Sequence, residues 1–119
     1  MRELTGHKVN PANDVLHVAA VDGPGPGGAS HVYTISGPDY SLHVKLEFQN
    51  GPINEAGVNG ITHEALLAIL IDRMEGFQSG QFANDYNQRA LDNLKSAQDE
   101  LLARTKERMS RGVEGTHQH

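Results

Sequence analysis

The sequence predicts an α+β fold in which a small N-terminal antiparallel β-sheet is followed by a long antiparallel two-helix hairpin, assembled as an oligomer. Short β-rich runs occupy the first half of the chain, and helical patterning runs from residue 62 to residue 111. This order of elements is typical of the α+β class. A chain of 119 residues is expected to form one domain overall, with a β-rich region at 1–58, the hairpin at 59–112 and a C-terminal tail at 113–119.

The β-rich region contains three candidate strands. Residues 1–13 are polar and show no periodicity. Short β-rich runs at 15–21 and 31–36 flank a glycine- and proline-rich loop at 22–28. In residues 41–49 apolar and polar side chains alternate, which predicts a strand with one buried face. The apolar positions of this strand are Leu42, Val44, Leu46 and Phe48.

The first helix is expected to begin at Thr62, a good N-cap, with Glu64 in the first turn, where a carboxylate suits the positive end of the helix dipole. Residues 65–71 are apolar without interruption, so apolar side chains point to every side of the helix. We therefore expect this helix to be wrapped by protein all round. The run is shorter than the ~20 residues that a membrane span needs.

The second helix is expected to begin near Asn84 or Asp85 and to continue to Arg111, with Gly112 as a left-handed C-cap residue. Its small and apolar residues follow the three-and-four spacing of an amphipathic helix. At 1.5 Å per residue this helix is about 40 Å long and the first about 24 Å, which leaves an overhang of roughly ten residues. Another part of the chain, or another copy of it, must cover Leu101, Leu102 and Met109 there.

The two ends of the hairpin carry the candidate binding groups. The connection at 76–82 contains Phe77 and Phe82, and the far end carries four cations with one acid, a local charge of +3. Arg104 and Arg108 are one turn apart, so their guanidinium groups could clamp a diphosphate. They could instead complement the helix dipole and form a solvated face, as at many helix ends, and Phe77 could either stack on a base or fill the top of the hairpin as a core residue.

Distance limits how these groups could work together. In a single hairpin Phe77 and Arg104 would lie roughly 30 Å apart along the second helix. If two hairpins pair antiparallel, the loop of one meets the arginines of the other. A nucleotide site built from these residues therefore predicts pockets that are shared between copies.

Composition excludes several other functions. The chain has no cysteine and a formal charge of −5, so we expect a reducing compartment and no nucleic-acid polymer as partner. None of the seven histidines stands at the spacing of a zinc protease or in a two-histidine phosphoesterase motif, and no serine nucleophile motif is present. We expect no catalytic residue, metal, cofactor, signal peptide or membrane partner.

Three segments resemble a known family: residues 59–73, the Gly-Phe-Gln-Ser-Gly run at 76–80, and residues 104–117 with their Arg-Gly-Val-Glu-Gly-Thr-His ending. The resemblance is to the phage anti-Thoeris sponge family, which shares its helical hairpin with the phage anti-CBASS cyclic-nucleotide sponges. It implies a protein that, in the cytoplasm of the infected bacterial host, sequesters cyclic ADP-ribose isomers made by TIR proteins without degrading them. It also implies assembly as a homodimer or hexamer.

The same resemblance implies two sites. Phe77, Asn87, Arg104 and Arg108 match the cyclic ADP-ribose pocket, with Phe77 and Arg104 stacking on adenine, Asn87 contacting a polar edge or ribose, and Arg108 holding phosphate. Gly80, Gln81, Phe82 and Ala83 match a second site for cyclic di- or trinucleotides. Gln81 stands where the family more often has proline. The alternative functions are a non-catalytic structural or adaptor protein that oligomerises through the hairpin and, third, a small hydrolase of such signals.

Overall fold

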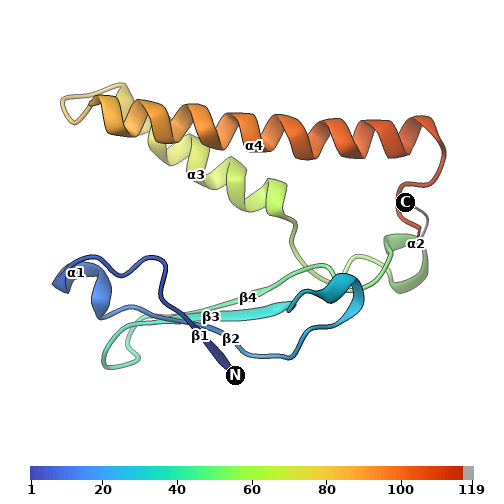
Figure 1. Ribbon diagram of the computed structural model, residues 1–119, viewed down its shortest axis with the longest axis horizontal. Coiled ribbons are helices and arrows are strands. Elements are labelled where there is room, and N and C mark those ends of the chain that lie inside the picture. Colours follow the sequence, from blue (N-terminus) through green and yellow to red (C-terminus); the bar gives the residue numbers. More distant parts are fainter. Residues whose placement is uncertain (117–119) are drawn as a thin grey trace. The chain divides into compact units, whose positions relative to one another are not determined.

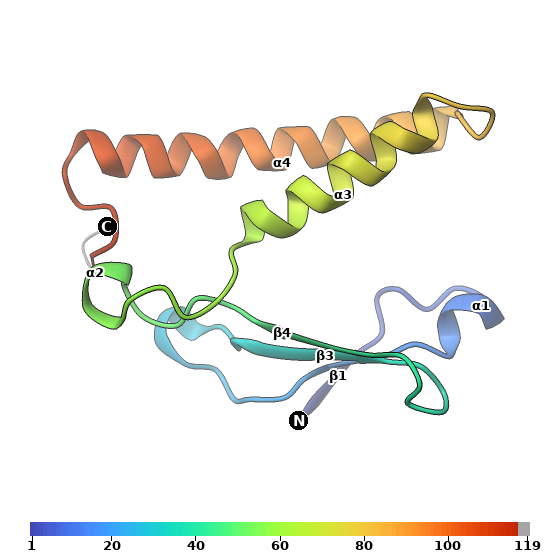
Figure 2. The ribbon, with the colours of Figure 1, turned by 180° about the vertical axis from the view of Figure 1, so that it is seen from behind.

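The computed structural model describes residues 1–116, and the chain divides into two compact units, Met1–Ile61 and Thr62–His119. The first unit is a β-sheet and the second is a helical hairpin, so the predicted α+β class and the order of the two parts are confirmed (Figures 1 and 2). No helix within the described residues is long and apolar enough to cross a membrane.

The first unit is a four-stranded antiparallel meander, in which each strand pairs with the next in sequence. The strands are β1 (Arg2–Leu4), β2 (His17–Ala20), β3 (Val32–Ser36) and β4 (His43–Glu47). Short helical turns α1 (Pro11–Asp14), η1 (Pro26–Gly28) and α2 (Ile53–Ala56) lie in the connections.

The N-terminal segment, which shows no periodicity in the sequence, contains the strand β1 and the start of the helical turn α1. Both are too short to show periodicity in the sequence. β1 forms because its residues pair with β2, with Glu3 opposite Ala19. The turn α1 forms because the side chain of Asn10 accepts a hydrogen bond from the Ala12 amide at 2.9 Å and Pro11 fits the first helical position.

The expectation of one buried face on the strand at 41–49 holds only in part. Leu46 and Phe48 are half-buried, and Phe48 packs edge-to-face on Tyr33 with ring centroids 5.7 Å apart. Leu42 and Val44, however, are 49% and 40% exposed. Leu42 precedes β4, and β4 is an edge strand, so fewer neighbours cover this end of the apolar stripe.

Backbone hydrogen bonds fix the connection between β2 and β3. The carboxylate of Asp22 accepts from the amides of Val32, at 3.0 Å, and His31, at 2.9 Å. These bonds, from Val32 first and His31 second, lower the pKa of Asp22 because they stabilise its charged form. The charged carboxylate thereby closes the glycine-rich loop onto the start of β3.

The segment after β4 folds back on it. Phe48 and Ile61 form an isolated parallel bridge, with the Gln49 amide donating to Ile61 O at 2.9 Å. Gly60 allows this approach, because a Cβ atom there would lie 2.4 Å from the carbonyl carbon of Phe48. The side chain of Asn59 closes the loop by bonding to both the amide and the carbonyl of Asn50.

The second unit consists of α3 (His63–Gln78) and α4 (Asp85–Ser110), which pack against each other. The predicted caps are confirmed: Thr62 accepts from the Ala65 amide, Asn84 accepts from the Asn87 amide, and Gly112 has a φ of 73°. Gln78 contacts Gln88 near the connection, and Gln98 donates to the Glu64 carbonyl at the start of α3. The helices are therefore antiparallel, and the last three turns of α4 overhang α3 as predicted (Figure 1).

The prediction that α3 is wrapped on all sides is wrong for this chain. Within its unit α3 packs on α4 through one side, and Leu91 of α4 is buried at 4% exposure. Ile69 is 64% exposed and Leu70 is 45% exposed. A single partner helix can cover only one side of a helix that is apolar all round, so these residues stay uncovered.

Candidate functional site: the two ends of the hairpin

Phe77 lies in the last turn of α3 and not in the connection, where the sequence analysis had placed it. The helix continues through residues 76–78 because the amide of Ser79 bonds to Glu75 O and its hydroxyl bonds to Gly76 O. The connection between the helices is therefore limited to residues 79–84. This places the Phe77 side chain on a regular helix, which fixes its direction.

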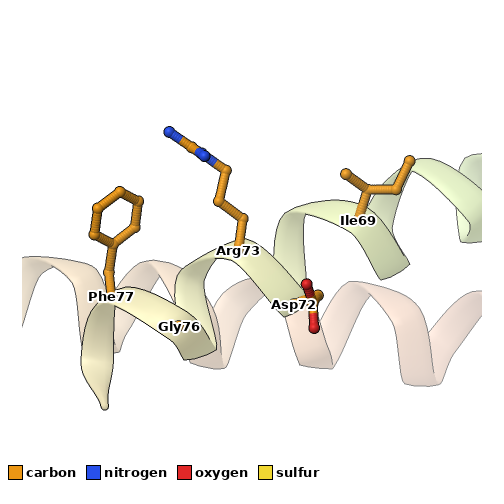
Figure 3. Close-up of a pocket in the computed structure, with 5 residues that line it drawn as sticks. All are labelled: Ile69, Asp72, Arg73, Gly76 and Phe77. Carbon is orange, nitrogen blue, oxygen red and sulfur yellow. The ribbon is translucent and has the colours of Figure 1, made fainter. Parts of the chain in front are cut away.

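An open hollow of about 510 Å³ lies beside Phe77 on α3. Its lining residues are Ile69, Asp72, Arg73, Gly76 and Phe77. Figure 3 shows Ile69, Arg73 and Phe77 rising from the same side of α3, as expected for residues four apart in a helix. The Cζ atom of Arg73 lies 5.1 Å from the centroid of the Phe77 ring, within cation–π range.

The four residues predicted for a second site form the exposed turn between the helices. Gly80, Gln81, Phe82 and Ala83 are all exposed, and the Ala83 amide closes the turn on Gly80 O at 3.2 Å. The ring of Phe82 is 65% exposed and packs edge-to-face on Phe77, with centroids 6.5 Å apart. The structure thus joins the two predicted sites through their aromatic rings.

Asn87 lies in the first turn of α4 and is half-buried. Its neighbour Gln88 accepts a hydrogen bond from the Gln78 side chain at 3.1 Å, and Gln78 follows Phe77. Asn87 and Phe77 therefore belong to the same end of the hairpin. We call this end, residues 69–89, the loop end.

Arg108 lies at the opposite end of α4 and is only 6% exposed. Its Nε donates to Glu114 Oε2 at 3.0 Å, and its Nη2 donates to the carbonyls of Val113 and Thr116 at 3.0 and 3.1 Å. A turn after Gly112 makes these contacts possible, because the Val113 amide returns to Arg108 O. Arg108 thus holds the residues after α4 against the helix.

The other predicted cations of this end are exposed. Arg111 forms an ion pair with Glu107, one turn earlier on α4. Arg104 is exposed, and its side chain forms no ion pair or hydrogen bond with any residue between 1 and 116. We call residues 101–116 the basic end.

The hairpin keeps its two ends apart. Gln88 marks the loop end, and Arg104 lies about 24 Å further along α4. One chain therefore brings Phe77 near Asn87, and Arg104 near Arg108, but does not bring the two pairs together. That a site using all four residues draws on a second copy stays a prediction.

Two residues of these ends were not predicted from sequence. Arg73 lies four residues before Phe77, so the helical spacing of the two could have revealed the pair. Glu114 could not have been found in this way, since it reaches Arg108 only through the turn after α4.

Among residues 1–116 the structure shows no cluster of three or more histidine, aspartate or glutamate side chains that could hold a metal ion. His117 and His119 lie outside the described residues.

Comparison with known proteins shows that more than half of this sequence matches a known protein family. The family model described as Acb2/Tad1, hairpin domain, matches residues 43–106, more than half of the chain. This chain belongs to that family. The match begins at the first residue of β4 and ends within α4.

A relative supports the same assignment. Over 95 residues the chain is 40% identical to a protein named Thoeris anti-defense 1 from Bacillus phage SBSphiJ7. The match covers 79% of this chain and 66% of the relative, so the chain spans slightly less than two thirds of that protein's length. The resemblance to this family, drawn from the sequence, is thereby confirmed.

Proposed function

We propose that this protein is a phage anti-defence protein that sequesters cyclic ADP-ribose isomers, the signals of a bacterial immune system, without degrading them. The observation that carries the proposal is the combination of the family match over residues 43–106 with 40% identity to a phage protein named for Thoeris anti-defence. Binding would withhold the signal from the immune effector in the host cytoplasm.

In this proposal the pocket forms between two copies whose hairpins pair antiparallel. The loop end of one copy provides Phe77 and Asn87, and the basic end of the other provides Arg104 and Arg108. The ligand's adenine stacks between Phe77 and Arg104, since both a phenyl ring and a guanidinium plane stack well on a base. Asn87 contacts a polar edge or the ribose, and Arg108 contacts phosphate.

The contacts of Arg108 determine how it can hold a phosphate. Its Nε already binds the carboxylate of Glu114, whose side chain is 38% exposed. A phosphate oxygen would replace that carboxylate, exchanging one anion for another on a guanidinium that the carbonyls of Val113 and Thr116 keep in place. The buried position of Arg108 therefore provides a pre-oriented donor.

Exposed apolar side chains support the assembly that the pocket requires. Ile69 and Leu70 on α3 and Leu102 and Met109 on α4 are between 38% and 64% exposed. Their burial against another copy would remove apolar surface from water, which drives most association. We propose a homodimer that can assemble further into a hexamer.

We further propose the connection between the helices as a second site, for cyclic di- or trinucleotides. The exposed Phe82 ring offers a stacking surface, Gly80 and Ala83 present backbone groups without bulky side chains beside it, and Gln81 adds a carboxamide.

Binding without turnover follows from the chemistry of the proposed residues. A phenyl ring and a carboxamide have no acid–base function near neutral pH, and arginine stays protonated in proteins. None of the four residues can act as a nucleophile or as a general base. The pocket can hold a glycosidic or phosphoanhydride bond but has no group with which to cleave it.

Thermal melts with a panel of cyclic ADP-ribose isomers and cyclic di- and trinucleotides test the function. A sponge gains stability as RT ln(1 + [L]/Kd), about 2.7 kcal/mol at a hundredfold excess of ligand over Kd. An adaptor protein that only oligomerises through the hairpin would show no ligand-dependent shift. Heating the complex and recovering the ligand intact supports sequestration, whereas a cleaved product would identify a hydrolase.

A further inference from the structure

Three dipeptides in the first unit place an aspartate or an asparagine directly before glycine: Asp22-Gly23, Asn50-Gly51 and Asn59-Gly60. At such a pair the amide nitrogen of the glycine can attack the side-chain carbonyl carbon of the preceding residue, because glycine has no Cβ to obstruct the approach. The attack requires that the side chain turn toward that nitrogen. Among residues 1–116 the structure shows hydrogen bonds to two of these three side chains and none to the third.

The side chains of Asp22 and Asn59 are fixed by backbone groups. The carboxylate of Asp22 accepts from two amides at the start of β3. The side chain of Asn59 accepts from the Asn50 amide and donates to the Asn50 carbonyl, both at 2.8 Å. The backbone of Gly60 is also closely packed, since a Cβ atom there would lie 2.4 Å from the carbonyl carbon of Phe48. Turning either side chain toward the following glycine would break its hydrogen bonds.

Asn50 differs from both. It is exposed, and its side chain forms no hydrogen bond with any residue between 1 and 116. The amide of Gly51, which would be the nucleophile, donates no hydrogen bond within the same range. The backbone of Asn50, in contrast, is held on both sides by the Asn59 side chain. The two groups that would react are therefore free of other partners in the described chain.

We propose that Asn50 is a site of spontaneous deamidation. The nitrogen of Gly51 forms a bond to Cγ of Asn50 and loses its proton, and the side-chain nitrogen takes up a proton and leaves as ammonia. Water then opens the resulting succinimide ring at either carbonyl carbon. The products are aspartate and isoaspartate, and in isoaspartate the main chain runs through the former side chain. Water is the only co-reactant, and either product adds a negative charge.

The modification would act on the clamp that closes the loop between β4 and α3. Isoaspartate inserts an additional carbon between Cα of Asn50 and the nitrogen of Gly51, which moves the carbonyl away from the Asn59 side chain. The side chain of Gln49 belongs to the same network, because it donates to the Gly51 carbonyl and accepts from the Asn59 amide, both at 3.0 Å. We expect residues 50–60 to open in the isoaspartate form and to become accessible to proteases.

The experiment is an incubation of the full-length protein at mildly alkaline pH, which favours the deprotonated amide nitrogen. Digestion after glutamate at mildly acidic pH, followed by mass spectrometry, places Asn50 in the peptide 48–55 and Asn59 in the peptide 56–64. We expect 48–55 to gain the mass of a deamidated residue severalfold faster than 56–64. Fragmentation of 48–55 assigns the change to Asn50 and detects isoaspartate.

The matched control for structure is the same chain incubated in denaturant. Both Asn-Gly pairs lose their hydrogen bonds on unfolding, so the two peptides should then change at similar rates. Equal rates in the folded protein, a faster change at Asn59, or no change in either peptide would overturn the proposal.

A variant tests the effect on the clamp. Asn50→Gln keeps the carboxamide but lengthens the side chain, which disfavours ring closure, and it removes no hydrogen bond of the described chain. Incubated wild type should be cut by protease within residues 50–60 faster than incubated Asn50→Gln, whereas fresh samples of the two should be equally resistant. Equal cleavage of the two incubated proteins would refute the loss of the clamp.

Discussion

Arg73 and Arg108, which lie at opposite ends of the hairpin, are held in opposite ways. At the loop end, Arg73 lies on a phenyl ring, has no counterion in the described chain and borders an open hollow. At the basic end, Arg108 is buried against Glu114 and two carbonyls, and Arg111 is paired with Glu107. A cluster of cations in a sequence therefore does not show which of them is available to a ligand, because the same chain can supply the carboxylates that occupy them.

Loss of Arg108 should have the largest effect, because this residue has a structural and a binding role. Arg108→Ala leaves the carbonyls of Val113 and Thr116 without their donor and frees the turn after α4. We expect the free energy of unfolding to fall by about 2–3 kcal/mol and ligand binding to be lost. Chemical denaturation measures the first effect and calorimetry the second.

The control for Arg108→Ala is Arg111→Ala, which removes an exposed arginine three residues later. It should change stability by less than about 0.5 kcal/mol. Equal destabilisation by the two variants would show that the burial of Arg108 contributes nothing.

Arg104→Ala should affect binding alone. Arg104 is exposed and forms no ion pair within residues 1–116, so its removal should leave the melting temperature without ligand unchanged. Binding should weaken by about 1.5–3 kcal/mol, as for the loss of a hydrogen bond to a charged group. Lys106→Ala, an equal loss of charge two residues along α4, is the control. Unchanged affinity in both Arg104→Ala and Arg108→Ala would refute the pocket.

Glu114→Gln should have a smaller effect than the two arginine variants, and it should strengthen ligand binding instead of weakening it. The substitution keeps the size of the side chain but removes the anion that occupies Arg108 Nε. We expect stability to fall by about 1 kcal/mol or less, because Glu114 is partly exposed, and ligand affinity to rise a few-fold. If affinity instead fell, the carboxylate would be part of the binding-competent arrangement and not a competitor of phosphate.

The smallest effect is expected for the exposed ion pair of Glu107 and Arg111. Glu107→Gln removes an i, i+4 contact on the solvent-facing surface of α4, which contributes about 0.5 kcal/mol or less. Ligand affinity should be unchanged at constant ionic strength. A clear change in affinity would mean that Arg111 belongs to the pocket.

Local signals predicted the hairpin well. Thr62, Asn84 and Gly112 each act through backbone groups within a few residues, so their roles as caps could be recognised from the sequence and are confirmed. The same holds for the overhang of α4, which follows from helix lengths alone. The end of the first helix was misplaced, because residues 76–78 were assigned to the connection, whereas hydrogen bonds of Ser79 extend the helix to Gln78.

The partners of individual side chains could not be predicted from the sequence. Arg108 meets Glu114 only because Gly112 turns the chain back, and β1 exists only because β2 provides its pairing. The exposure of Ile69 depends on how much of α3 a single helix can cover. Each of these outcomes depends on tertiary contacts, which periodicity does not encode.

The central claim is that a nucleotide pocket joins the loop end of one copy to the basic end of another, and a mixing experiment tests it most directly. Phe77→Ala and Arg104→Ala should each bind ligand poorly. After the two variants are mixed and allowed to exchange subunits, pairs that combine them contain one pocket with both wild-type residues. The account predicts that calorimetry of the mixture recovers a fraction of sites with wild-type affinity. A mixture that binds no better than its components, or a wild-type protein that binds ligand as a monomer, would contradict it.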